Sequence, residues 1–333
     1  MRMTKNTWQT AGALAAATLL AACGGGGGGT QETSPPASQR AAITAQNQAV
    51  VADETVSSAL APVETLGAGG VTPKSSGGRP PVLALARRYF AALPSLALPG
   101  GGTWTKAQET QTIACSGGGT ITVTANDADN NGALSAGDSV AMAFDNCVEP
   151  EGRVGGSLQF AVSAYDASSG SMGATLAFNS FSLAAGGDAV NANGTLAMAS
   201  SITSSDRWSL SLSTSQLTVG GTIAGRTETR QLSDYSATVS QEPSGTTVLT
   251  RYQARGDLGS SAISGGSVHF ETTTPFTVTG AASTPSSGVM QVTGAGGSAL
   301  RLTALADGQL QRELDADGNG SFESSTIGAW PAL

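Results

Sequence analysis

Apolar and polar residues alternate in short runs from about Thr103 to the end of the chain. Side chains two apart lie on the same face of a β-strand, so this period of two is typical of strands with one buried face. Clusters of Gly, Asn and Asp separate the runs at intervals of roughly 8–15 residues, which indicates antiparallel hairpins in series. The apolar positions include Val140, Met142, Phe144, Leu158, Phe160, Val162, Leu210, Leu212, Val268, Phe270, Leu300 and Leu302.

This pattern predicts an all-β fold, a many-stranded antiparallel meander of about 14–16 strands arranged as a sandwich or a partly closed barrel-like sheet. A transmembrane barrel is less favoured, because the strands lack the aromatic residues that gather at the two membrane interfaces of such barrels.

Two stretches before the strands have helical character. Between Pro81 and Pro94 six apolar residues fall on one helical face, which predicts a short amphipathic helix over residues 82–98. Its two arginines lie off that face, so the helix either touches an anionic membrane surface or packs on the β domain; two arginines make a thin basic face, which favours packing. Residues 40–60 have weak periodicity and predict at most one helix of low stability. The six apolar residues are Val82, Leu85, Ala86, Tyr89, Phe90 and Leu93.

Composition agrees with a turn-rich β protein. Glycine accounts for 45 of 333 residues, aromatic residues for 5% and charged residues for 12%. The net charge is −8. An acidic surface repels phosphate backbones, which argues against a nucleic-acid partner, and it attracts divalent cations.

The N-terminus has the order of a secretory signal peptide. Arg2 and Lys5 precede an apolar run over residues 11–22, and small residues precede Cys23. The ending Leu20-Ala21-Ala22-Cys23 resembles the lipobox of bacterial lipoproteins. The resemblance implies cleavage before Cys23, a diacylglycerol on its sulfur, and a further fatty acyl chain such as palmitate on the new N-terminus.

A flexible tether is expected after Cys23. Six consecutive glycines and a Ser/Pro/Thr-rich stretch follow it, and a chain of this composition cannot bury apolar surface. The predicted organisation is a signal peptide over residues 1–22, a lipidated tether with a possible weak helix over 23–81, the amphipathic helix over 82–98 and the β domain over 99–333.

The expected location is the outer membrane, with the domain facing the periplasm or the cell surface. Gly24 stands where the best-known sorting rule of lipoproteins places an Asp for retention at the inner membrane. No other apolar run approaches the 18 or so residues of a membrane helix. The lipid on Cys23 is therefore the expected membrane contact.

Cys115 and Cys147 remain once Cys23 is lipidated. A pair of cysteines in an exported protein predicts a disulfide, and the alternative is two buried thiols. Closing this loop would stabilise the fold by about 3–4 kcal/mol in the chain-entropy description.

The segment from Asp127 to Asp138 resembles the calcium loop of EF-hand proteins. Acidic and amide residues at positions 1, 3 and 5, a Gly at 6 and an apolar residue at 8 match that loop. Ser135, at position 9, could contribute through water. The loop departs from the family in having Asp instead of Glu at position 12 and strands instead of helices on either side. The expected calcium ligands are Asp127, Asp129, Asn131 and Asp138.

A second segment repeats this start. Asp315, Asp317 and Asn319 occupy positions 1, 3 and 5, and Gly320 occupies position 6. Position 12 is Thr326, which is not acidic, so Glu323 at position 9 is the expected substitute ligand. The alternative for both loops is an Asn/Asp/Gly hairpin turn, but a turn does not require Asp at both positions 1 and 3, which favours calcium. If they bind Ca²⁺, its expected role is structural, and loop and disulfide would brace the same corner of the domain.

Catalytic patterns are missing from the sequence. His269 is the single histidine, no Gly-x-Ser-x-Gly motif occurs, and ligands for zinc are too few. We therefore expect no enzymatic activity and assign no catalytic residue; a carboxylate-based hydrolase is an alternative.

Two further features have weak functional interpretations. Arg255-Gly256-Asp257 spells the tripeptide that integrin-binding adhesins display, although Gly and Asp are common at turns. Trp104, Trp208 and Trp330 could line a sugar site but more often anchor a core or an edge. The chain resembles uncharacterised Gly/Ser-rich β lipoproteins of Gram-negative bacteria. The sequence therefore predicts a lipid-anchored lipoprotein whose calcium-stabilised β domain is a structural or ligand-binding module, with a surface adhesin as the alternative.

Overall fold

The computed structural model describes residues 39–66, 86, 108–150, 152–223, 225–264 and 266–331. The chain divides into residues 1–33 and 34–333, and every described residue belongs to the second unit. The signal peptide, Cys23 and the glycine run lie outside the described residues. The helix predicted over residues 82–98 does too, except for Ala86, which is helical and fully buried.

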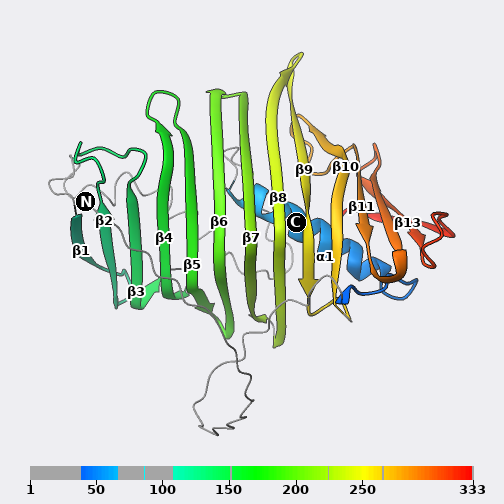
Figure 1. Ribbon diagram of the computed structural model, residues 1–333, viewed down its shortest axis with the longest axis horizontal. Helices are drawn as coiled ribbons and strands as arrows, with labels where there is room; N and C mark the ends of the chain where they lie inside the picture. Colours follow the sequence, from blue (N-terminus) through cyan, green and yellow to red (C-terminus); the bar gives the residue numbers. More distant parts are fainter. Residues whose placement is uncertain are drawn as a thin grey trace, which may run out of the picture. The chain divides into compact units, whose positions relative to one another are not determined.

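The described strands form one 14-stranded antiparallel sheet in which each strand pairs with the next along the chain (Figure 1). The prediction of an all-β meander is confirmed. The strands are β1 (Gln108–Ala114), β2 (Thr120–Asn126), β3 (Ser139–Glu149), β4 (Gly152–Asp166), β5 (Ser171–Ala185), β6 (Asp188–Ser204), β7 (Arg207–Ile223), β8 (Arg226–Ser244), β9 (Thr247–Ser260), β10 (Ser267–Thr279), β11 (Ser287–Thr293), β12 (Ala299–Ala304), β13 (Gln309–Asp315) and β14 (Ser324–Ala329).

The sheet does not close into a barrel. Among the described residues, β1 pairs only with β2, and β14 pairs only with β13. Because these strands belong to one sheet, the sandwich arrangement is not formed either. One turn of 3₁₀ helix, η2 (Ala295–Gly297), separates β11 from β12.

The core lies on one face of the sheet, as the period of two requires. Strand β2 alternates strictly between buried and half-buried residues. Its Val123 pairs with Met142 of β3, which pairs with Leu158 of β4, and Leu158 pairs with Phe178 of β5. All four side chains are at most 4% exposed. Burying each one contributes about 1.5–3 kcal/mol, so rows of this kind set the register of the sheet.

Helix α1 (Gln48–Leu66) packs on the sheet and contacts β7, β8, β9, β12 and β13. In Figure 1 it runs across the strands behind the sheet from β8 onward. Every residue from Glu54 to Leu60 is buried. The sequence places this stretch in the tether with at most a weak helix. The helix lacks a clear apolar stripe because the residues from Glu54 to Leu60 are buried whatever their helical position.

Glycines face left-handed residues at two interruptions of the strand pairing. Ser180 (φ 48°) and Asn146 (φ 49°) have positive φ angles, and the register of β4 shifts near each of them. A Cβ on Gly156 would lie 2.1 Å from the carbonyl oxygen of Ser180, and one on Gly119 would lie 2.1 Å from that of Asn146. Only glycine fits opposite these bulges, which increase the local twist of the sheet.

Candidate metal centres in two matching loops

Loop 1 (Asp127–Asp138) joins β2 to β3, and its first carboxylate is buried. Asp127 is 2% exposed. Its Oδ1 accepts the backbone N–H of Asn131 at 3.3 Å, and its Oδ2 accepts that of Gly132 at 2.8 Å. Asp129 accepts the backbone N–H and the side-chain amide of Asn131 at 3.1 and 2.8 Å. These contacts curl the loop around its own acidic side chains.

Asp138 closes loop 1 from the other end. Its side chain is fully buried. Oδ1 accepts the backbone N–H of Ala128 at 2.9 Å, and Oδ2 accepts that of Ser135 at 2.6 Å. The Ser135 hydroxyl also lies 3.2 Å from both Asp129 Oδ2 and Asp138 Oδ2. The residue at position 12 therefore fastens the end of the loop to its beginning.

Loop 2 (Asp315–Glu323) begins at the last residue of β13 and curls in the same way. Asp315 is 3% exposed. Its Oδ1 accepts the backbone N–H groups of Gly318 and Asn319 at 2.8 and 3.2 Å, and its Oδ2 accepts that of Gly320 at 2.8 Å. Asp317 accepts the backbone N–H and the side-chain amide of Asn319 at 3.1 and 2.9 Å.

Glu323 takes the place in loop 2 that Asp138 has in loop 1. Its Oε2 accepts the backbone N–H of Ala316 at 3.0 Å, just as Asp138 accepts that of Ala128 at 2.9 Å. Thr326, at position 12 of the sequence pattern, lies in β14 and is exposed. Loop 2 is therefore shorter than loop 1, and the longer side chain of Glu323 at position 9 accepts the hydrogen bond that Asp138 accepts at position 12 of loop 1.

The two loops share five hydrogen bonds at equivalent positions. A sixth has the same donor, the backbone N–H of position 2, but its acceptor is at position 12 in loop 1 and at position 9 in loop 2. Positions 4 and 6 also have left-handed backbone in both. An ordinary Asx turn requires only some of these contacts. The φ angles are 58° at Asn130, 74° at Gly132, 74° at Gly318 and 87° at Gly320.

Three carboxylates converge in each loop. One oxygen from each acidic residue lies within 4.8 Å of the others, in the sets Asp127, Asp129, Asp138 and Asp315, Asp317, Glu323. Burial on its own would raise the pKa of Asp127, but hydrogen bonds, chiefly from the Gly132 N–H, outweigh it and lower that pKa. Ionised carboxylates this close repel one another, and a divalent cation would remove the repulsion.

The donor set suits Ca²⁺. Carboxylate and amide oxygens are its preferred ligands, and six to eight are needed. A carboxylate oxygen that accepts one N–H keeps a lone pair for a metal. The ligands predicted in loop 1, including Asn131, lie on the curled segment, and so do Asn319 and Glu323 in loop 2. Sequence reasoning missed the amide donors of Ala128 and Ala316, because a backbone N–H leaves no mark on residue type.

Loop 2 is supported from a neighbouring strand. The guanidinium of Arg301 in β12 lies 4.3 Å from the ring centre of Phe322, the apolar residue at position 8. Arg301 also binds Glu313 of β13 through two hydrogen bonds of 2.7 and 2.8 Å. The hydrogen bonds from Arg301 lower the pKa of Glu313. Cation–π contact and ion pair together hold the side of the loop against the sheet.

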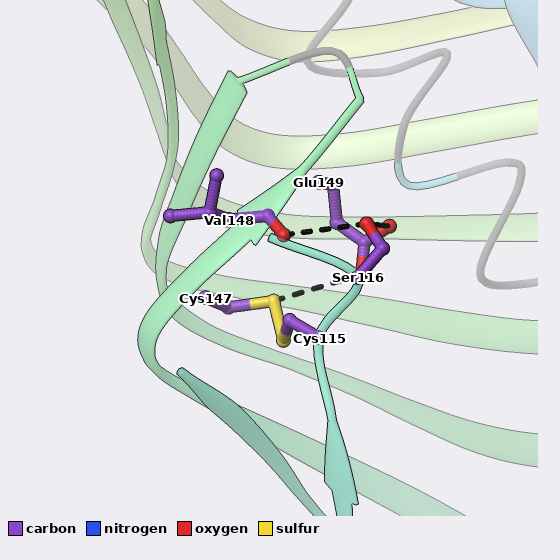
Figure 2. Close-up of a disulfide and its surroundings, with 5 residues drawn as sticks. All are labelled: Cys115, Ser116, Cys147, Val148 and Glu149. Atoms are coloured by element: carbon purple, nitrogen blue, oxygen red, sulfur yellow. Dashed lines mark hydrogen bonds between the residues drawn. A yellow bond between two sulfur atoms is a disulfide. The ribbon is translucent and has the colours of Figure 1, made fainter. Parts of the chain in front are cut away.

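The predicted disulfide joins Cys115 to Cys147 with 5.4 Å between their Cα atoms. Figure 2 shows it linking the turn after β1 to β3, beside Ser116 and Glu149, whose Oγ and Oε2 are 3.5 Å apart. The bond lies at the start of β2, whereas loop 1 follows the end of β2. The disulfide and loop 1 therefore lie at opposite ends of β2, which is seven residues long. The expectation that they brace the same corner of the domain is wrong.

His269 and the Arg-Gly-Asp tripeptide meet on adjacent strands. His269 Nδ1 lies 3.2 Å from Asp257 Oδ1, and Arg40 Nη2 lies 3.4 Å from the same oxygen. The tripeptide lies within the second half of β9, and Gly256 packs against Tyr235 of β8. Asp257 is thus engaged within the sheet and not displayed on a projecting turn.

The tryptophans that the structure describes are anchors. Trp330 is 8% exposed, and its ring meets that of Phe276 edge-on with 5.2 Å between centres. Trp208 is half-buried against the core. Trp104 lies outside the described residues. A sugar site built from these rings has no support in this geometry.

A polar depression crosses the exposed face of β5 to β9. Its volume is about 510 Å³, and Thr175, Thr195, Ser213, Asp234, Ser236 and Arg255 are among the residues that line it. Asp234 has a positive φ of 47°. This conformation occurs at a β-bulge, as it does at Asn146 and Ser180, so it belongs to the construction of the sheet and does not by itself mark a reactive group.

Comparison with known proteins returned no match to a family model, a curated protein or a solved structure. Among the residues that the structure describes, no helix combines the length and the apolar character needed to cross a membrane.

Proposed function

We propose that this chain is a lipid-anchored outer-membrane lipoprotein whose β domain is stabilised by Ca²⁺ and serves as a structural or ligand-binding module. The observation that carries the proposal is the shared hydrogen-bond pattern of loops 1 and 2, each of which gathers three carboxylates. Two loops distant in sequence would have little reason to converge on this arrangement if each were only a turn.

In this proposal Ca²⁺ has a structural role in both loops. Asp127, Asp129, Asn131 and Asp138 would hold one ion, and Asp315, Asp317, Asn319 and Glu323 would hold the other. The ion supplies positive charge among clustered carboxylates and fixes the connections β2–β3 and β13–β14. Asp in place of Glu at position 12 of loop 1 shortens the reach of that ligand, so we expect weaker binding than in high-affinity EF-hands.

Isothermal titration with CaCl₂ tests the metal sites. The full-length protein should bind two ions, Asp127→Asn and Asp315→Asn should each bind one, and the double variant should bind none. Asp307→Asn is the matched control, because Asp307 also accepts a backbone N–H in a hairpin turn but belongs to neither cluster. No heat of binding, or binding that survives in the double variant, would rule the sites out.

The membrane anchor is supported by the lipobox ending at Cys23 and by the glycine-rich stretch after it. Two or more acyl chains, at about 0.8 kcal/mol per buried methylene, give stable attachment where one chain is marginal. Mass spectrometry of the protein from its native membrane should find a mature chain that starts at Cys23 and carries lipid. An uncleaved leader or an unmodified thiol would overturn this part of the proposal.

The adhesin alternative draws no support from the Arg-Gly-Asp tripeptide, because Asp257 is paired with Arg40 and His269. The hydrolase alternative lacks a supporting feature as well. His269 has an acidic partner, but no described contact adds a nucleophile to the pair. The structural or ligand-binding module is therefore the proposal that the geometry supports best.

A further inference from the structure

The last strand of the sheet leaves an open edge. Among the described residues, β14 pairs with β13 alone. Ser325, Thr326, Ile327 and Ala329 are exposed, and Ser324 and Gly328 are half-buried. Ile327, at 59%, is the most exposed large apolar side chain among the described residues. No described strand pairs with this side of β14, so on that side half of the strand's backbone N–H and C=O groups have no partner strand among the described residues.

Strand β14 lacks the features by which proteins protect such edges. Natural edge strands carry lysine or another charge, proline or a bulge that blocks further pairing. Ser324–Ala329 contains no charged residue and no proline, and its pairing with β13 is continuous over all six residues. The opposite edge, β1, carries Glu109. The edge at β14 is thus the more open of the two to an added strand.

Both ends of β14 are fixed. Loop 2 precedes it, and the N–H of Glu323 donates to the carbonyl of Leu314 at 2.9 Å. Trp330 follows it and is buried against Phe276. A strand that is already held at both ends and paired along one side loses little conformational freedom when it pairs on the other, which favours association.

We propose that β14 pairs antiparallel with β14 of a second copy of this chain. The two-fold arrangement is closed and self-complementary, and an uncharged strand meets no repulsion from its own copy. Parallel pairing would bring the acidic loop 2 of both copies together. Antiparallel pairing separates the two loops by the length of the strand, about 20 Å for six residues.

The contact is small. A stable complex usually buries more than about 1,200 Å², which six strand residues do not provide by themselves. The dimer is therefore reversible and forms at high concentration, as among copies held on one surface. This inference does not depend on Ca²⁺, and the dimer and the metal sites are tested by different measurements.

Sedimentation equilibrium of the full-length protein over a range of concentrations tests the pairing. Ile327→Lys puts a charge on the open edge and should weaken association at least tenfold without changing the melting temperature. Thr112→Lys puts the same charge on the exposed edge β1 and should leave association unchanged. A monomer at every concentration, or a dimer lost in Thr112→Lys but kept in Ile327→Lys, would overturn the proposal.

Disulfide trapping provides a second measurement that does not depend on how the lysine variants fold. In a Cys23→Ser background, with Cys115 and Cys147 bonded to each other, Thr326→Cys supplies one free thiol near the middle of β14. It should oxidise to a covalent dimer, while Thr112→Cys should not. Trapping through Thr112→Cys alone, or no covalent dimer through Thr326→Cys, would contradict the β14 pair.

Discussion

Glu323 and Asp138 stand at different positions of their loops and accept the same hydrogen bond, from the backbone N–H of position 2. The extra methylene of Glu lets the shorter loop reach its own beginning. Glu323 could be proposed from the sequence because it shares the odd-numbered phase of the other ligands. The hydrogen bond that closes each loop could not be predicted, because its donors are the backbone N–H groups of Ala128 and Ala316.

At the residue scale, Glu323→Gln tests whether position 9 substitutes for position 12. Removing a charged oxygen ligand should weaken Ca²⁺ binding in loop 2 by roughly tenfold or more and leave loop 1 unchanged. Thr326→Ala is the sharp control, because Thr326 fills position 12 in sequence but lies exposed in β14. Titration calorimetry measures the affinity of each variant. Weaker Ca²⁺ binding in Thr326→Ala together with unchanged binding in Glu323→Gln would contradict the assignment.

At the scale of elements, α1 is fastened to the sheet by polar contacts in a buried setting. Glu54 binds Arg230 of β8 through two hydrogen bonds of 2.7 and 2.8 Å and accepts the Ser260 hydroxyl at 2.8 Å. The Tyr235 hydroxyl donates to the carbonyl of Ala59 at 2.8 Å. Burial raises the pKa of Tyr235, so this phenol stays protonated as a donor. Such contacts fix where the helix lies as well as how strongly it is held.

Glu54→Gln should destabilise the protein by about 2–4 kcal/mol, because it leaves Arg230 without its main partner in a largely buried position. Asp53→Asn removes the neighbouring ion pair between Asp53 and Arg312. The Asp53 side chain is 53% exposed, so this change should lower the free energy of unfolding by less than about 1 kcal/mol. Urea unfolding of both variants measures the difference. Equal losses, or no loss in Glu54→Gln, would show that the pair does not hold α1.

The period of two predicted the strands, whereas the sequence predicted at most one helix of low stability over residues 40–60, where α1 begins. The difference has one physical reason. A strand with one buried face has an apolar residue at every second position, as β3 has at Val140, Met142 and Phe144. In α1 every residue from Glu54 to Leu60 is buried, the polar Thr55, Ser57 and Ser58 included, so the buried positions form no apolar stripe. Strand order followed from the short connections, but the open edges did not, because closure depends on curvature that residue types do not encode.

At the scale of the whole sheet, the two loops stand at opposite edges. Loop 1 follows the even-numbered strand β2 and loop 2 follows the odd-numbered strand β13, so they also lie at opposite ends of the strands. The disulfide constrains the edge near β1 from the end opposite to loop 1. The terminal strands have a neighbour on one side only, so these three features reinforce the parts of the sheet that pairing holds least.

The central claim is that Ca²⁺ stabilises this sheet through loops 1 and 2, and a thermal melt with CaCl₂ or with a chelator tests it most directly. At a free Ca²⁺ concentration 100 times the dissociation constant, each site adds about 2.7 kcal/mol, enough to raise the melting temperature by about 5 °C or more. Asp127→Asn with Asp315→Asn should abolish the shift, and Asp307→Asn should keep it. A melting temperature that is the same with Ca²⁺ and with chelator would contradict the account.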